Sequence, residues 1–228
     1  MELSRAKPRH WGLSFAYRLN RWLPMSRARK LDLMLDAAWI ASRLAHENSV
    51  GLDLDRQEQN HFLLDRIAPS DSVLELGCGT GDVIGSVTAS RRLGIDNDEA
   101  RIAIARQRFP AVEFAVADLR QYLDRPFDVL VLSHVLEHLD DPEAVLRAGQ
   151  FGRIYVELPD FDADPLNQVR LRRDRSLVYS DADHVRELRR EEAEQMFARA
   201  GLTASDSEFR RGVMRYWLTR PPPSPRRS

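Results

Sequence analysis

The stretch of residues 73–82 constrains the fold more than any other part of the chain. It reads V-L-E-L-G-C-G-T-G-D, an apolar run with one carboxylate followed by glycines at 77, 79 and 81. A short apolar run is typical of a buried strand, and glycine is typical where the backbone takes a positive φ or approaches a ligand closely. A helical pattern follows over Thr80–Ala89. Strand, glycine turn and helix in this order predict the nucleotide-binding unit of a doubly wound α/β fold.

The spacing of these glycines separates two kinds of ligand. A dinucleotide fingerprint reads G-x-G-x-x-G, whereas here the third glycine falls one residue early and Asp82 takes the fingerprint position. A carboxylate at a helix N-terminus opposes a bound pyrophosphate but tolerates a cationic or zwitterionic ligand. The pattern therefore argues against a nicotinamide dinucleotide.

Residues 71–219 alternate between strand and helix patterns, which predicts a parallel sheet with right-handed crossovers closed by a hairpin. The expected strands are Ser72–Leu76, Arg92–Ile95, Glu113–Ala115, Asp128–Leu132, Arg153–Glu157, Leu202–Phe209 and Val213–Thr219. The expected helices between them are Thr80–Ala89, Asp98–Phe109, Asp141–Ala148 and Arg190–Ala200.

Polar residues follow three of these strands. Asp96 comes about 20 residues after the glycine turn, where a carboxylate can accept two hydrogen bonds from a ribose diol. Asp118 follows the third strand and can accept from an exocyclic amine such as adenine N6. Ser133 and His134 follow the fourth strand and open the run S-H-V-L-E-H-L-D-D-P.

Together, L-E-L-G-C-G-T-G-D, G-I-D, A-D-L and F-D-V-L-V-L-S-H-V-L-E-H-L-D-D-P resemble the motifs of class I S-adenosylmethionine-dependent methyltransferases of the small-molecule branch. The resemblance covers about residues 70–160. It implies a Rossmann-like α/β fold with seven mostly parallel strands, an antiparallel C-terminal hairpin, helices on both faces and extra N-terminal helices. It also implies S-adenosyl-L-methionine as cofactor, bound by Glu75, Gly77, Gly79, Gly81, Asp96, Asn97, Asp118, Leu119 and Ser133.

The implied reaction is methyl transfer from a sulfonium to an oxygen or nitrogen atom by in-line displacement. Alignment of the reacting atoms alone can contribute ~7–11 kcal/mol, and an oxygen nucleophile also needs a proton acceptor. The candidate catalytic bases are His134, His138 and His184. His134 and His138 share a helix face, but Glu137 points elsewhere on such a helix, so no metal site is expected.

Residues 160–189, the polar insertion, interrupt the alternation and predict a lid or an acceptor-binding loop. Arg170, Arg173 and Tyr179 are its candidate acceptor contacts, since arginines clamp phosphate and carboxylate groups. The alternative is a solvated helix face. The acceptor is expected to be a small molecule, a sugar or a glycan- or lipid-linked compound, and an acidic one if the clamp interpretation holds. Nucleic acid is not expected, because the net charge is −1 and no N-P-P-Y-like motif follows the fourth strand.

The N-terminal residues 1–30 hold eight Lys/Arg against one acid, interleaved with aromatic residues. Such a stretch fits peripheral contact with an anionic membrane, and equally a helix that packs its aromatic residues on the main domain. Amphipathic helices are expected at Arg27–Glu47 and from a capping pair, Asp55 and Glu58, to near Ile67.

We therefore expect a helical cap segment at 1–68, a methyltransferase domain at 69–220 and a disordered tail at 221–228. A single cysteine, Cys78, and the lack of a long apolar run favour the cytoplasm. Two other functions stay open at this stage, a non-catalytic S-adenosylmethionine-binding module and a nicotinamide-dependent oxidoreductase.

Overall fold

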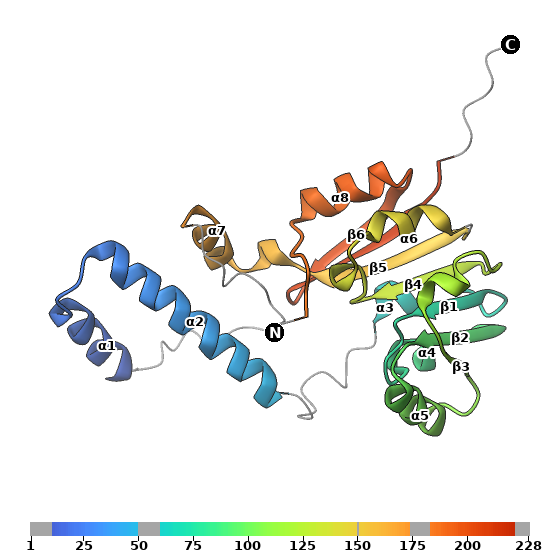
Figure 1. Cartoon of the computed structure of the whole chain (residues 1–228), viewed down its shortest axis with the longest axis horizontal. Helices are drawn as coiled ribbons and strands as arrows, with labels where there is room; N and C mark the ends of the chain where they lie inside the picture. Colours follow the sequence, from blue (N-terminus) through green and yellow to red (C-terminus); the bar gives the residue numbers. More distant parts are fainter. Residues whose placement is uncertain (1–10, 50–59, 150, 174–182, 222–228) are drawn as a thin grey trace, which may run out of the picture. The chain divides into compact units, whose positions relative to one another are not determined.

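The structure, a computed structural model, describes residues 11–49, 60–149, 151–173 and 183–221 (Figure 1). Contacts along the chain divide it into two compact units, residues 1–52 and 53–228. None of the described helices combines the length and apolar character needed to cross a membrane. Of the tail expected to be disordered, residues 221–228, all but Pro221 lie outside the described part of the chain.

The first unit consists of two helices, α1 (Trp11–Trp22) and α2 (Arg27–Ser49). Ser26 stands just before α2, and its hydroxyl accepts a hydrogen bond from the backbone N–H of Arg29 at 3.3 Å, as expected of an N-cap residue. The helix predicted from Arg27 is therefore confirmed.

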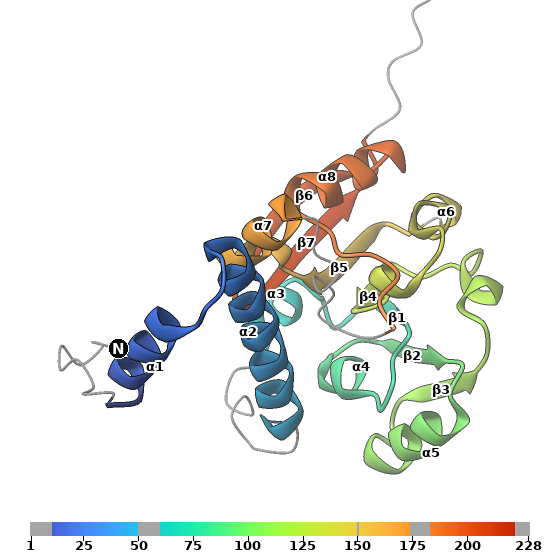
Figure 2. The same ribbon diagram turned by 60° about the vertical axis from the view of Figure 1, so that its left-hand side comes forward.

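The second unit is a seven-stranded sheet with helices on both faces (Figure 1 and Figure 2). The strands are β1 (Ser72–Leu76), β2 (Arg91–Asp96), β3 (Glu113–Val116), β4 (Val129–Ser133), β5 (Arg153–Pro159), β6 (Thr203–Arg210) and β7 (Val213–Thr219). The helices are α3 (His61–Leu64), α4 (Asp82–Ser86), α5 (Glu99–Arg108), α6 (Pro142–Ala148), α7 (Pro165–Arg172) and α8 (Arg190–Arg199), and the 3₁₀ turns are η1 (Leu119–Tyr122), η2 (Leu136–His138) and η3 (Phe161–Ala163).

The strand order is β3-β2-β1-β4-β5-β7-β6. β1 pairs in parallel with both β2 and β4, whereas β7 runs antiparallel to β5 and β6. The predicted fold class, including the C-terminal hairpin, is confirmed. The chain builds outward from β1 to β3 and then returns to place β4 beside β1. In open α/β sheets, ligands bind at the carboxyl ends of the strands where the order reverses in this way.

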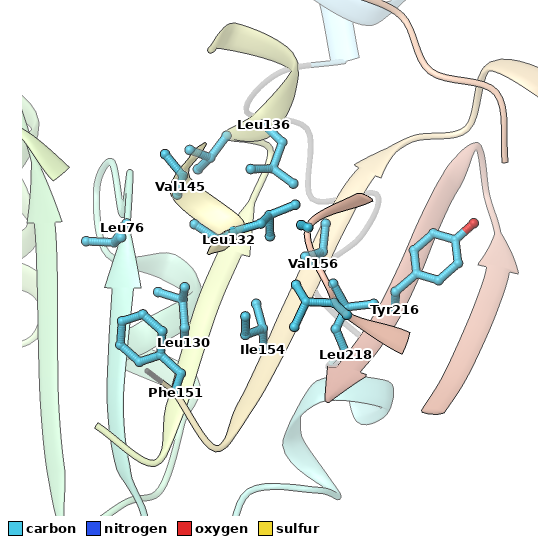
Figure 3. Close-up of a cluster of buried hydrophobic side chains, with 14 of the residues drawn as sticks. Leu76, Leu130, Leu132, Leu136, Val145, Phe151, Ile154, Val156, Tyr216 and Leu218 are labelled. Atoms are coloured by element: carbon cyan, nitrogen blue, oxygen red, sulfur yellow. The ribbon is translucent and has the colours of Figure 1, made fainter. Parts of the chain in front are cut away.

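Successive strand residues face opposite sides of the sheet, which divides the core into two layers. On one side Leu132 and Val156 pack with α6 and α8, as Figure 3 shows. On the other side Val73 and Val131 pack with α3, α4 and α5. Strands with both faces buried are continuous apolar runs, which is why β1 and β4 were recognisable in the sequence.

The segment before β1 differs from the prediction. The capping pair Asp55 and Glu58 lies outside the described residues. α3 begins only at His61, and Asn60 is its N-cap, because its side-chain oxygen accepts from the Leu63 N–H at 3.1 Å. Leu63 is fully buried in the core of the second unit. The division near residue 52 therefore falls earlier than the predicted boundary at 68.

The helix after the glycine turn is shorter than expected. α4 ends at Ser86, because Val87 returns to an extended conformation with ψ 138°. It starts only at Asp82, because Gly81, its N-cap, is left-handed at φ 82°. The turn therefore extends further into the region between β1 and α4 than the helical pattern indicated.

Candidate active site

The glycine turn after β1 is held against the end of β2. The backbone N–H groups of Gly77 and Cys78 both donate to the Ile95 carbonyl, at 2.7 and 2.9 Å. Gly77 has φ 71°, and a Cβ there would lie 2.6 Å from a methyl carbon of Val135. Both the left-handed backbone and the close packing therefore require glycine at this position.

Asp96, at the end of β2, faces this turn. Its Oδ2 accepts from the Gly79 N–H at 2.7 Å and its Oδ1 accepts from the Asp98 N–H at 2.9 Å. The residue is 8% exposed. A carboxylate oxygen has two acceptor sites, so each oxygen retains capacity for a ligand hydroxyl while the backbone fixes its position.

Two cavities open at the carboxyl ends of the strands and share Gly77 and Arg101 as lining residues. The first cavity has a volume of about 270 Å³ and the second about 480 Å³, within the range of small-molecule sites. Of the residues predicted to bind a cofactor, the first cavity is lined by Glu75, Gly77, Gly79 and Ser133. The second is lined by Gly77, Asp96, Asn97, Asp118 and Leu119. Gly81 lines neither cavity as described and instead begins α4.

Asp118 lies at the edge of the second cavity. Its Oδ1 caps η1 by accepting from the Arg120 N–H at 2.8 Å, and its Oδ2 lies 3.3 Å from a guanidinium nitrogen of the same arginine. The side chain is half exposed. It therefore combines a local capping contact with a position from which it can reach a ligand.

Glu75 is the one carboxylate within β1, and it is 2% exposed. Its Oε2 accepts from the Ile84 N–H at 2.9 Å and so ties the strand to α4. Burial disfavours the charged form and raises the pKa of Glu75 to about 8, against which the Ile84 hydrogen bond acts only in part. Burial therefore favours the protonated form of this carboxyl.

His134 follows β4 with φ 53°, a left-handed conformation that is uncommon outside glycine and clusters at functional sites. Its Nδ1 lies 3.1 Å from Oε1 of Glu137, and its Nε2 lies 3.4 Å from Oε1 of Glu157. Burial alone would lower the pKa of His134, but the two carboxylates outweigh it and raise the pKa to about 9. This arrangement favours the protonated ring, and the role of His134 as a general base stays a prediction.

Glu157 connects His134 to residues that the sequence analysis missed. Its Oε2 accepts from the Tyr155 hydroxyl at 2.6 Å, from the Asn60 amide at 3.0 Å and from the Arg215 guanidinium at 2.7 Å. Burial would raise the pKa of Glu157, but hydrogen bonds from His134 and Tyr155 and the charge of Arg215 lower it to about 2. Its place near the end of β5 is the signal that could have revealed it, by the rule that identified Asp96.

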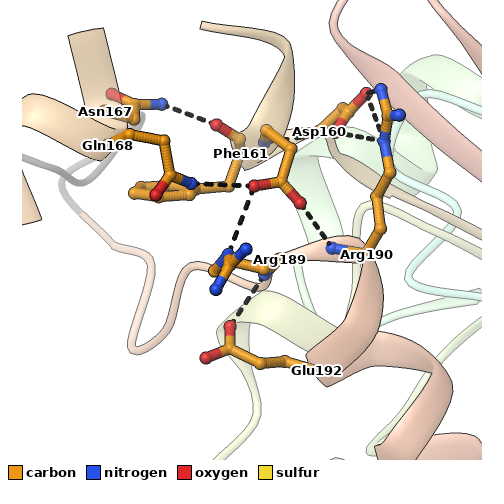
Figure 4. Close-up of polar contacts among 8 residues, drawn as sticks. Asp160, Phe161, Asn167, Gln168, Arg189, Arg190 and Glu192 are labelled. Carbon is orange, nitrogen blue, oxygen red and sulfur yellow. Dashed lines mark hydrogen bonds and ion pairs between the residues drawn. The ribbon is translucent and has the colours of Figure 1, made fainter. Parts of the chain in front are cut away.

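The polar insertion contains two elements that the sequence analysis did not expect, η3 and α7. Figure 4 shows how its two ends are held together. Asp160 pairs with Arg190, and the Asp162 carboxylate accepts from the Arg189 side chain and the Arg190 backbone N–H. The insertion therefore leaves and rejoins the domain at one point.

The two arginines predicted as acceptor contacts in this insertion line neither described cavity. The Arg170 side chain is 4% exposed, and its guanidinium donates to Asp164 and Asn167 at 3.1 and 2.7 Å. It therefore braces the start of α7 and does not form an exposed clamp. Arg173 is the C-cap of α7 and lines neither described cavity. Tyr179 lies outside the described residues.

The end of the insertion, by contrast, returns to η2. The Val185 N–H donates to the Glu137 carbonyl at 3.0 Å, and Arg186 donates to the carbonyl of Leu139 at 2.9 Å. These contacts bring His184 beside His138, with ring centroids 4.8 Å apart. His138 lines the second cavity, as does His134.

An α/β sheet whose order reverses beside a glycine turn and two strand-end carboxylates defines a nucleoside-binding domain. The family model described as "Methyltransferase domain" matches residues 53–206, and the chain belongs to this family. The family predicted from the motifs is thus confirmed.

Relatives and solved structures agree with this family. A "Probable S-adenosylmethionine-dependent methyltransferase" of Mycolicibacterium smegmatis is 34% identical over 147 residues, which cover 59% of this chain and 53% of the relative. A trans-aconitate 2-methyltransferase of Rhizobium rhizogenes is 26% identical over 132 residues, covering 53% of this chain and 51% of the relative. The chain thus spans about half the length of these two curated relatives.

Among solved structures, magnesium protoporphyrin IX methyltransferase from Synechocystis with bound S-adenosylhomocysteine has a TM-score of 0.53 at 15% identity and covers 92% of this chain and 95% of that one. The O-methyltransferase NcsB1 of neocarzinostatin biosynthesis has a TM-score of 0.54 at 18% identity, covering 92% of this chain and 67% of that one. At such identities the likeness shows the shared fold.

Proposed function

We propose that this chain binds S-adenosyl-L-methionine and transfers its methyl group to an oxygen or nitrogen atom of a small-molecule acceptor. The observation that carries the proposal is the pair of cavities that meet at Gly77. Most of the glycine turn lines the first cavity. The second cavity extends from Asp96 past Asp118 to His134. A nucleoside and an acceptor can thereby meet at one edge of the sheet.

In this proposal the cofactor lies across the carboxyl ends of β1 to β4. Asp96 holds the ribose hydroxyls, because its oxygens are fixed by backbone N–H groups and retain acceptor sites. The adenine lies by Asn97, Asp118 and Leu119. The methionine part lies in the first cavity by Glu75, Gly77, Gly79 and Ser133, and Gly81 shapes the start of α4 beside it.

The reaction needs little more than alignment. The sulfonium is already an activated donor, so the acceptor atom attacks the methyl carbon as the carbon–sulfur bond breaks, and the bonding electrons remain on sulfur. Orientation of this kind contributes on the order of 7–11 kcal/mol. The acceptor would enter the second cavity beside His134 and His138. In this position the His134 ring, held between Glu137 and Glu157, would contact the acceptor, and its predicted role as a base stays a prediction.

A small-molecule acceptor agrees with the names of two similar proteins, the trans-aconitate 2-methyltransferase and the O-methyltransferase NcsB1. The prediction that the acceptor is acidic depends on Arg170 and Arg173, and these two residues line neither described cavity. The family match is to a methyltransferase domain and gives no support to the nicotinamide-dependent alternative. A non-catalytic module would bind the cofactor without turnover.

For the first unit we propose contact with an anionic membrane surface. On α1, Phe15, Tyr17 and Trp22 are 62%, 68% and 82% exposed, and Arg18 and Arg21 lie on the same helix. Aromatic and basic side chains together favour the interface of anionic lipids. The chain should sediment with phosphatidylserine vesicles, and Trp22→Ala should lower the fraction of protein that sediments with them. Equal binding to uncharged vesicles would contradict the proposal.

A cytoplasmic location stays a prediction.

The experiment that tests the catalytic proposal is turnover by the full chain. We expect S-adenosylhomocysteine to form from S-adenosylmethionine in the presence of one member of a panel of hydroxy acids, phenols and amines, and not in its absence. Asp96→Asn should reduce formation of the product. Cofactor binding without turnover across a broad panel would favour the non-catalytic module, and absence of binding would overturn the proposal.

A further inference from the structure

Three side chains beside the second cavity form a cluster that methyl transfer as proposed does not use. Glu137, His138 and His184 each offer one donor atom, and these atoms all lie within 4.8 Å of one another. Glu137 and His138 come from η2, whereas His184 comes from the returning end of the polar insertion. The sequence analysis expected no metal here, since it placed Glu137 on a different helix face and could not bring His184 to η2.

The Glu137 carboxylate is only half satisfied. The residue is 2% exposed, and its Oε1 lies 3.1 Å from Nδ1 of His134. Its Oε2 is buried and has no hydrogen-bond partner among the residues that the structure describes. A buried polar atom without a partner costs about 1–3 kcal/mol, and more when the group is charged. A cation bound at this oxygen would remove that cost.

Both histidines are oriented as metal ligands usually are. Nδ1 of His184 lies 2.9 Å from Oε1 of Glu187, and Nδ1 of His138 lies 3.3 Å from the Asp183 carbonyl. With the proton on Nδ1, each ring directs the lone pair of Nε2 away from these partners. Metal-ligating histidines almost always donate their other ring N–H to a carboxylate or a carbonyl, which fixes the tautomer.

The backbone holds the two segments of the cluster together. The Val185 N–H donates to the carbonyl of Glu137 itself, at 3.0 Å. Two ligands of one tetrahedral ion, each at about 2.1 Å, lie about 3.4 Å apart. A pair of donor atoms at the 4.8 Å limit must therefore close by about 1.4 Å, a change in side-chain rotamers that leaves this backbone pairing in place.

We propose that Glu137, His138 and His184 bind a divalent transition-metal ion with an open position toward the second cavity. Two imidazoles and a carboxylate suit zinc and its first-row neighbours, whereas magnesium and calcium prefer oxygen ligands alone. Three protein ligands with one position left open are typical of catalytic rather than structural sites. His138 and Asp183 both line the second cavity, so a ligand there can reach the ion.

The role of the ion rests on the proposed function. An acceptor hydroxyl bound to it would become more acidic, as metal-bound water does. The proton of the acceptor hydroxyl passes to water. The acceptor oxygen then forms a bond to the methyl carbon as the carbon–sulfur bond breaks. The electron pair of that bond stays on sulfur, which becomes the neutral thioether of S-adenosylhomocysteine. The ion would thus supply the activation of the nucleophile.

The test uses the full chain, stripped with chelator and titrated with Co²⁺. We expect uptake of about one ion per chain with a visible absorption band, since ligand count is a checkable property of such a site. His138→Ala and His184→Ala should each remove the band. Glu187→Gln, which removes the charge beside Nδ1 of His184, should weaken binding about 10- to 100-fold. His61→Ala is the matched control, because His61 is an exposed histidine paired with Asp65.

Folding and function are controlled separately. Each variant should keep the circular dichroism spectrum of the parent, and His184→Ala should bind S-adenosylhomocysteine within about twofold, since His184 lines neither described cavity. Where a histidine variant does not fold, Glu137→Gln, which keeps the shape of the side chain, replaces it and should also lose the band. Absence of saturable uptake at millimolar Co²⁺, or uptake unchanged in these variants, would overturn the inference. Uptake without S-adenosylhomocysteine binding would instead retain the metal site and remove the proposed function.

Discussion

The two halves of the candidate site are built by different kinds of contact. Around β1 and β2, backbone groups fix the position of the functional side chain. The backbone N–H groups of Gly79 and Asp98, which are 17 and 2 residues from Asp96 in the sequence, donate to its carboxylate. Around β4 and β5, side chains hold one another across long separations, as Asn60 and Glu157 do over 97 residues. A backbone-built site is encoded in a short stretch of sequence, whereas a site built from distant side chains exists only after folding.

The largest effect should come from the backbone of the first half. Gly77→Ala adds a Cβ 2.6 Å from a Val135 methyl carbon to a residue at φ 71°. We expect a cost of about 1–3 kcal/mol from the left-handed conformation and loss of measurable S-adenosylhomocysteine binding by calorimetry. Gly212→Ala is the control, since it has φ 76° with nothing within 4 Å, and it should keep full binding. Equal binding by both variants would break the comparison.

The next effect tests the carboxylate that this backbone holds. Asp96→Asn keeps the shape but removes the charge that accepts from Gly79 and the expected ribose hydroxyls. Hydrogen bonds to charged groups contribute about 1.5–3 kcal/mol, so S-adenosylhomocysteine affinity should fall about 10- to 150-fold. Asp128→Asn is matched, because Asp128 also accepts a backbone N–H, from Ser72 at 2.8 Å, but lines neither described cavity. Weaker binding in Asp128→Asn alone would contradict the assignment.

The second half should respond in catalysis and not in cofactor binding. Glu157→Gln removes the charge that faces His134 at 3.4 Å and Arg215 at 2.7 Å. We expect kcat to fall about tenfold, as for a misplaced group near the reacting atoms, while S-adenosylhomocysteine affinity stays within about twofold. Steady-state kinetics with the active acceptor and calorimetry separate the two. A parallel loss of cofactor affinity would show that the halves are not independent.

The last effect concerns the pH dependence of stability in the first half. The pKa of Glu75 is raised to about 8 from an ordinary 4.5, because the carboxyl is buried. The native state therefore keeps a proton that the unfolded chain releases above pH 4.5, and stability must fall as pH rises between these values, by at most about 1.4 kcal/mol per pH unit. Glu75→Gln should lose this decline, so the unfolding free energies of the two proteins should converge or cross toward pH 8. A constant difference from pH 5 to 8 would contradict the raised pKa.

The comparison also explains what the sequence could predict. The buried strand β1, the glycine turn and the place of Asp96 follow from local rules, because an apolar run, a positive φ at Gly77 and a strand end are all properties of neighbouring residues. The fold class was predicted correctly for the same reason. The binding roles of these residues stay predictions.

The geometry of the half around β4 and β5 could not be predicted from the sequence, because it depends on tertiary contacts. The left-handed backbone of His134 has no signal in a single sequence, since the residue is not glycine. The burial of Arg170 depends on Asp164 at the start of α7, a helix that the polar composition of the insertion concealed. The approach of His184 to His138 depends on the hydrogen bond from the Val185 backbone N–H to the Glu137 carbonyl, two residues that are distant in the sequence.

The most direct test of the account is calorimetric titration of the full chain with S-adenosylhomocysteine, beside Asp96→Asn and Glu157→Gln. The account predicts saturable binding at one site per chain, markedly weakened in Asp96→Asn and unchanged in Glu157→Gln. Absence of binding at high micromolar ligand, or equal weakening in the two variants, would contradict the claim that the cofactor site depends on Asp96 and not on Glu157.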